Sequence, residues 1–93
     1  MMPKQVEMEI PLLRCLDEMG GKGKPADIYA RISKFFPNVT ESDLAETLPS
    51  GGNKWTNRIQ WVRLRLVTRG EMGNAERGIW SITEAGSARL SDL

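Results

Sequence analysis

Five cationic side chains lie between residues 47 and 70, a stretch that contains no Asp or Glu. Every one of the 12 acidic residues lies outside it, although the net charge of the whole chain is only +1. Guanidinium and ammonium groups gathered in this way bind phosphate groups. On charge pattern alone, a surface helix made basic for solubility remains an alternative. The stretch predicts a phosphate-bearing partner, and its bases are Lys54, Arg58, Arg63, Arg65 and Arg69.

These bases must be positioned by a helix, because apolar residues recur between them at spacings of four, three and four. Such spacing is typical of an amphipathic helix with one buried stripe. The pattern predicts a helix over residues 53–69, with Asn53 as its N-cap and Gly70 as its end. The stripe consists of Trp55, Ile59, Val62 and Leu66.

Two polar sectors flank the stripe. One holds Thr56, Gln60 and Arg63. We favour the other as the nucleic-acid face, because it collects four of the five bases and an amide that can read adenine. Leu64 lies opposite the stripe, so part of this side could instead be covered by another element. The favoured sector contains Lys54, Asn57, Arg58, Arg65 and Arg69.

Three further side chains have two interpretations each. Trp61 lies in the favoured sector; burial is usual for Trp and packing is therefore expected, with base or sugar contact as the alternative. Arg58 either reads a base or anchors the helix through a buried acid or a backbone carbonyl. Arg77, at the tip of a predicted hairpin, either enters or borders the minor groove or is simply a polar turn residue.

The remaining elements are short. We expect a first helix over residues 11–19 with Pro11 in its first turn, and the alternative is a helix extended backwards to Val6. A turn or minimal strand should follow at 22–24, and a second helix over 25–36. Thr40 should cap a third helix that reaches Leu48, residues 71–82 should form a two-stranded hairpin, and Thr83 should cap a last helix. This order predicts a mainly α fold with a small β hairpin, the winged helix-turn-helix, in which helix 53–69 is the recognition helix and 71–82 the wing.

Composition limits the possible functions. We expect one domain over residues 1–93, cut from a longer protein. We expect a cytoplasmic location, because no signal peptide or membrane-spanning run is visible. The chain has no His and only Cys15, so it has neither the commonest general base nor a set of N and S metal ligands. We expect the acids to be solvated on helix surfaces, and we predict no catalysis, no metal, no cofactor and no small-molecule substrate.

Several motifs spread over nearly the whole chain carry a resemblance. They are Ile10-Pro11-Leu12-Leu13, Leu48-Pro49-Ser50-Gly51, Asn57-Arg58-Ile59-Gln60-Trp61, Leu66, Gly70 and the run Arg-Gly-Ile-Trp-Ser-Ile-Thr-Glu-Ala-Gly at 77–86. Together they resemble the N-terminal domain of Mrr-type restriction endonucleases. The resemblance implies a winged-helix domain of a bacterial restriction system that binds double-stranded DNA and precedes a nuclease domain acting on DNA with modified bases.

The nuclease of that family uses an Asp and an acid-x-Lys triplet to hold a divalent metal, and no Lys of this sequence has an acid two residues before it. Catalysis would therefore belong to a C-terminal domain of the full-length protein. Two alternatives to a targeting module remain open. One is a free-standing transcriptional regulator, which would normally dimerise to read a palindrome. The other is a winged helix used for protein contacts through Trp61 and Leu64.

Overall fold

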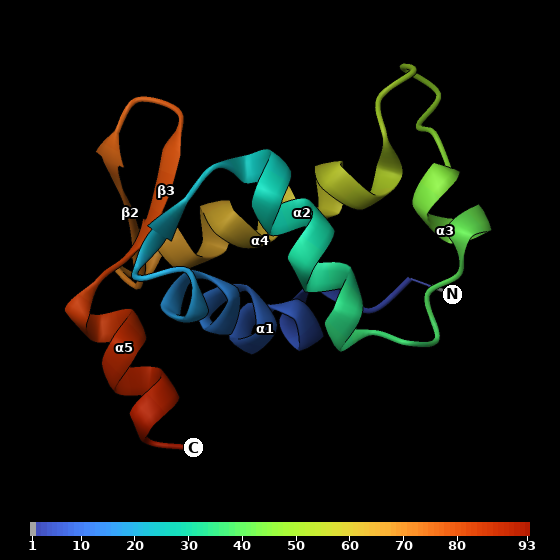
Figure 1. Cartoon of the computed structure of the whole chain (residues 1–93). Helices are drawn as coiled ribbons and strands as arrows, with labels where there is room; N and C mark the ends of the chain where they lie inside the picture. The colour runs from blue at the N-terminus through green and yellow to red at the C-terminus, as the bar shows by residue number, and fades with distance from the viewer. Residues whose placement is uncertain (1) are drawn as a thin grey trace.

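The computed structural model describes residues 2–93, and Met1 of the expected domain lies outside them. In chain order the elements are α1 (Gln5–Glu18), β1 (Lys22–Gly23), α2 (Pro25–Ile32), the 3₁₀ turn η1 (Ser33–Phe35), α3 (Glu41–Ala45), α4 (Lys54–Thr68), β2 (Met72–Glu76), β3 (Ile79–Ile82) and α5 (Glu84–Ser91). The predicted mainly helical fold with a small antiparallel sheet is confirmed, and its element order is compatible with a winged helix-turn-helix (Figure 1). The hairpin and α3 lie at opposite ends of the molecule, with α1 and α4 between them.

The sheet has one strand more than the expected hairpin. β1 pairs with β3 in antiparallel register, Lys22 opposite Ser81, so the strand order is β1-β3-β2. β2 pairs with the other edge of β3, Met72 opposite Ile82, and the register shifts between Gly73 and Glu76. The two residues of β1 thus tie the segment before α2 to the wing.

The first helix begins near Val6, the alternative start, and not at Pro11. α1 starts at Gln5, so Pro11 lies inside the helix and not in its first turn. A proline there removes one backbone hydrogen bond. The added residues bury both Met8 and Glu9 completely, and burial of the apolar Met8 side chain opposes the loss.

The second and third helices end earlier than expected. α2 is α-helical only to Ile32 and continues as the 3₁₀ turn to Phe35. Thr40 caps α3 as predicted, because its Oγ1 accepts from the backbone N–H of Asp43 at 3.1 Å. The helix stops at Ala45 because Glu46 is extended and its carbonyl accepts from the backbone N–H of Lys54 at 2.9 Å.

The core lies mainly between α1 and α4. The predicted stripe of α4 is buried against α1, together with Ile28 and Ile32 of α2 and Trp80 of β3. α5 packs closely on the start of the wing, since a Cβ built on Gly86 would lie 2.3 Å from the carbonyl oxygen of Glu71. Helix α4 is therefore fixed along one side, and its opposite side remains available.

Candidate nucleic-acid interface

The start of α4 is fixed by Asn53. Its Oδ1 accepts from the backbone N–H of Thr56 at 2.9 Å, which confirms the predicted N-cap. Its Nδ2 donates to the carbonyl of Leu44 at 2.8 Å, so the same side chain ties α3 to α4. A bridge between Thr47 and Asn53 closes the intervening loop. The geometry that orients α4 is thus set before its first turn begins.

The outward face of α4 lies opposite the buried stripe and is formed by Asn57, Gln60, Trp61, Leu64 and Thr68. Trp61 is 52% exposed and Leu64 is 49% exposed. The expectation that Trp61 packs between elements is therefore wrong, because the four stripe residues already fill the contact with α1. This face carries amides, a hydroxyl and apolar groups but no charge.

Three of the expected bases flank the outward face on the side of α1, and two of them contact a buried acid. Nη2 of Arg65 lies 2.8 Å from Oε2 of Glu9, and Nη1 of Arg69 lies 3.3 Å from Oε1 of the same carboxylate. Arg89 of α5 adds a contact of 2.9 Å to Glu9. Glu9 has no exposed surface, whereas the side chains of Arg65 and Arg69 are about half exposed.

Glu71 extends this cluster to the start of the wing. It lies 2.7 Å from Arg89 and 3.6 Å from Arg69. The ion-pair network, as we call Glu9, Arg65, Arg69, Glu71 and Arg89, joins α1, α4, α5 and the segment before β2. The expectation that the acids are all solvated is wrong for Glu9 and Glu71, because these three guanidiniums compensate their charge inside the fold.

The network sets the protonation state of Glu9. Burial alone raises the pKa of this carboxyl group, but hydrogen bonds and positive charge from Arg89 and Arg65 outweigh it. The pKa of Glu9 therefore lies below its ordinary value, and the group is ionised at neutral pH. A buried anion next to α4 holds Arg65 and Arg69 in fixed positions.

Arg58 and Lys54 also have partners within the chain. Nη1 of Arg58 donates to the carbonyl of Pro3 at 3.0 Å, which is the anchoring role considered for it. Nζ of Lys54 lies 3.7 Å from Oε2 of Glu46, and both side chains are substantially exposed. An exposed pair at that distance contributes little to stability and leaves the ammonium group accessible.

The other polar sector of α4 faces the wing and α2. The guanidinium carbon of Arg63 lies 5.1 Å from the centroid of the Trp80 ring, and Nη2 donates to Oδ1 of Asn74 at 2.5 Å. Gln60 lies at the border between this sector and the outward face, and its Nε2 donates to the hydroxyl of Tyr29 of α2 at 3.1 Å. Arg63 thus orients the hairpin relative to α4.

Arg77 occupies the turn between β2 and β3 and is exposed. Within residues 2–93 it makes no ion pair or side-chain hydrogen bond. Lys22 on the neighbouring strand β1 lies 3.4 Å from Glu76. The wing tip therefore presents a cation with no internal partner among the residues described.

The expected site residues do not all form one surface, although Trp61, Arg65 and Arg69 line one shallow hollow. Asn57 and Trp61 lie on the outward face, Arg65 and Arg69 belong to the ion-pair network, Arg58 contacts Pro3, Lys54 lies at the start of α4 and Arg77 at the wing tip. Sequence reasoning missed the parts played by Glu9, Arg63 and Arg89. A signal for Glu9 was present, since it follows Met8 in a helix whose apolar face includes Leu12 and Leu16.

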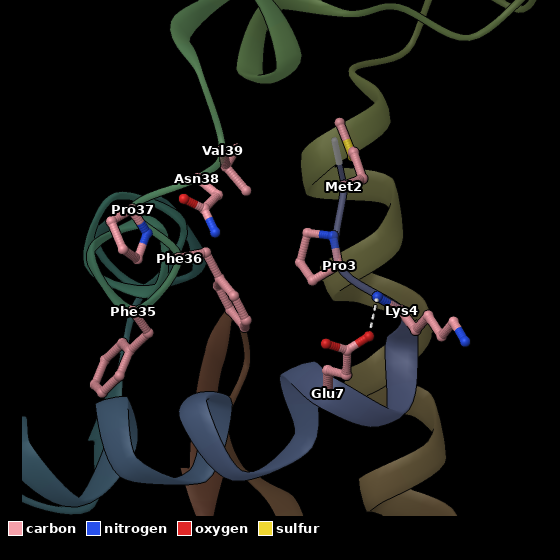
Figure 2. A pocket seen from close by; sticks show the side chains of 9 residues that line it. All are labelled: Met2, Pro3, Lys4, Glu7, Phe35, Phe36, Pro37, Asn38 and Val39. Atoms are coloured by element: carbon pink, nitrogen blue, oxygen red, sulfur yellow. Dashed lines mark hydrogen bonds between the residues drawn. The ribbon is translucent and has the colours of Figure 1, made fainter.

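A cleft of about 310 Å³ lies apart from this surface, between the N-terminal segment and the connection from η1 to α3 (Figure 2). Its lining is mostly apolar, with Phe36 on one wall and Pro3 on the other. Glu7 is its only carboxylate, and this group accepts a hydrogen bond from the backbone N–H of Lys4 at 3.2 Å. The charged side chains that line this cleft are thus Glu7 and Lys4.

Across the described part of the chain, no group of three or more His, Cys, Asp or Glu side chains is placed to hold a metal ion. Over the same residues, no helix combines the length and apolar character needed to span a bilayer. Burial raises the pKa of the Cys15 thiol to about 11, so this thiol is unreactive at neutral pH.

A comparison with protein-family models gives one match. The model described as the Mrr N-terminal domain matches residues 6–92, nearly the whole chain. Neither curated proteins nor solved structures give a match. The matched family is one of N-terminal domains, and its name associates the chain with Mrr-type restriction systems.

Proposed function

The chain belongs to the Mrr N-terminal domain family, and from this premise we propose that it binds double-stranded DNA as the targeting module of an Mrr-like, modification-dependent restriction endonuclease. In this proposal α4 enters the major groove and the hairpin of β2 and β3 contacts the adjacent backbone. Residues 1–93 act as one domain of a longer cytoplasmic protein of bacterial origin. Hydrolysis of DNA belongs to a C-terminal nuclease domain.

One observation carries the proposal: α4 has four bases and no acid along its length, and a fifth base, Arg69, directly follows its last residue. On its outward face, Trp61 and Leu64 are each about half exposed. Phosphates of duplex DNA border both sides of a helix inserted in the major groove. Bases on both flanks of α4, with uncharged groups between them, match that arrangement. Lys54 at one end of the helix and Arg77 at the wing tip extend the positive surface.

A protein partner is the second candidate, because Trp61 and Leu64 together expose apolar surface. A free-standing regulator is a third. A regulator of this kind is expected to form a two-fold dimer, whereas a targeting module is expected to be a monomer. Sedimentation of the isolated chain measures its oligomeric state and so distinguishes the two.

Salt titration of binding to a duplex library, with and without methylated adenine or cytosine, tests the main proposal. For a DNA-binding module, log K should fall linearly with log salt, with a slope of about −0.9 for each phosphate contact. A preference for methylated duplexes would support the modification-dependent role. Absence of binding to any duplex at low salt would instead favour a protein partner.

A further inference from the structure

The outward face of α4 carries two apolar side chains that lie next to each other. Trp61 and Leu64 are three residues apart on the helix, and each exposes about half of its surface. The water-facing side of a surface helix normally carries polar groups. Among the large hydrophobic residues, only Val6 and Leu93 are comparably exposed within residues 2–93; Val6 lies on α1, and Leu93 follows α5.

Cationic side chains border this pair on both flanks. Trp61 and Leu64 line one shallow hollow together with Arg65 and Arg69, and a second hollow together with Arg63. A second copy of the chain docked here around a two-fold axis would bring like charges together, which is unfavourable. The partner that fits the charge is a polyanion with apolar groups between its phosphates.

Duplex DNA offers one such group in the major groove, the C5-methyl of thymine. Asn57 lies one turn before Trp61 on the same face, and its amide can pair with adenine, the partner base of thymine. We propose that Trp61 and Leu64 contact thymine methyl groups and so give the domain a preference for adenine–thymine pairs. This inference rests on the proposed DNA-binding function.

The expected size of the effect follows from the area that one methyl group buries. Burial of one methyl or methylene group favours binding by about 0.8 kcal/mol, which corresponds to about a fourfold change in Kd. A site that covers several thymines should therefore lose at least about fourfold in affinity when all of their methyl groups are absent.

The test compares two duplexes that differ only in these methyl groups: an alternating adenine–thymine duplex and the same duplex with deoxyuridine for thymine. Fluorescence anisotropy at fixed salt should show tighter binding to the thymine duplex by about fourfold or more. Leu64→Ala and Trp61→Ala should bring the ratio of the two Kd values towards one. Leu64→Met, which keeps an apolar side chain, and Val6→Ala, which lies on α1, should retain it.

Four other results would contradict the proposed methyl contact, its assignment to Trp61 and Leu64, or DNA binding itself. Equal binding of the unaltered chain to both duplexes would overturn the methyl contact and leave DNA binding intact. A ratio that survives in both Leu64→Ala and Trp61→Ala would place the thymine reader elsewhere. A preference for 5-methylcytosine over cytosine, without any difference between thymine and deoxyuridine, would also overturn the proposed contact with thymine methyl groups. Failure to bind either duplex at low salt would overturn the proposed function itself.

Discussion

Nη2 of Arg65 lies 2.8 Å from Oε2 of Glu9, a contact that joins a half-exposed guanidinium on α4 to a carboxylate on α1 with no exposed surface. The same carboxylate also forms ion pairs with Arg69 and Arg89. Two of the bases that give α4 its positive surface are therefore also structural groups. Substituting them changes stability and binding together, whereas Glu9 can be altered without touching the exposed surface.

We expect Glu9→Gln to lower the free energy of unfolding by about 1 to 3 kcal/mol. Glutamine preserves the shape but removes the charge that three guanidiniums share. The cost stays below that of a fully buried pair because Arg65 and Arg69 can be hydrated. Urea denaturation measures the change, and Glu18→Gln, on an exposed position of the same helix, is the matched control. Equal effects of the two substitutions would argue against the ion-pair network.

The same variant should change how stability depends on pH. The pKa of Glu9 is lowered in the folded protein from an ordinary value of 4.5. The ionised group therefore adds stability above that value, and this contribution is lost as the pH falls through the folded-state pKa. The difference in unfolding free energy between wild type and Glu9→Gln should be largest near neutral pH and shrink as the pH falls below 4.5. A constant difference would show that Glu9 does not titrate in this way.

The sequence was sufficient to predict the elements whose signals are local. The stripe of α4, the N-caps Asn53, Thr40 and Thr83, and the hairpin each depend on residues close together in the chain. For the start of α1 the sequence left two alternatives, Pro11 and Val6. Pro11 favours a start at that residue locally, whereas the burial of Met8 and Glu9 in the longer helix depends on α4 and α5.

The candidate site was harder to predict than the fold. Periodicity identified the buried side of α4, but it does not show which neighbour covers each flank. Arg65 and Arg58 share a sector of the helix, yet one pairs with a carboxylate on α1 and the other with the carbonyl of Pro3. Such contacts join residues 55 or 56 positions apart, and no local pattern records them.

The assignment of the buried and outward sides of α4 can be tested by two truncations. Ile59 has no exposed surface, so Ile59→Ala should cost about 2 to 5 kcal/mol in unfolding free energy. Leu64 is 49% exposed, and Leu64→Ala should change the unfolding free energy by less than about 0.5 kcal/mol. Chemical denaturation of both variants gives the comparison. A larger cost at Leu64 than at Ile59 would mean that the helix is rotated.

The salt dependence of DNA binding separates contacting charges from other charges. Arg77→Ala at the wing tip and Lys54→Ala at the start of α4 should each flatten the slope of log K against log salt by about 0.9 if each side chain contacts one phosphate. Arg31→Ala, on an exposed position of α2 away from α4's outward face, is the control and should leave the slope unchanged. If Arg77→Ala and Lys54→Ala have the same slope as the unaltered protein and Arg31→Ala, then neither Arg77 nor Lys54 contacts a phosphate.

Asn57 and Arg58 are neighbours in sequence but should respond differently to truncation. Asn57 lies on the outward face, and no hydrogen bond of its side chain occurs within residues 2–93, so Asn57→Ala should keep the melting temperature. It should lose about 1 to 3 kcal/mol of discrimination for a preferred base, because one bidentate contact contributes that much. Arg58→Ala removes the hydrogen bond to Pro3 and should lower the melting temperature while weakening binding to all duplexes in proportion. Thermal melting and competition binding on both variants measure stability and base preference. A loss of base preference in Arg58→Ala with an unchanged melting temperature would mean that Arg58 reads a base and does not anchor the helix.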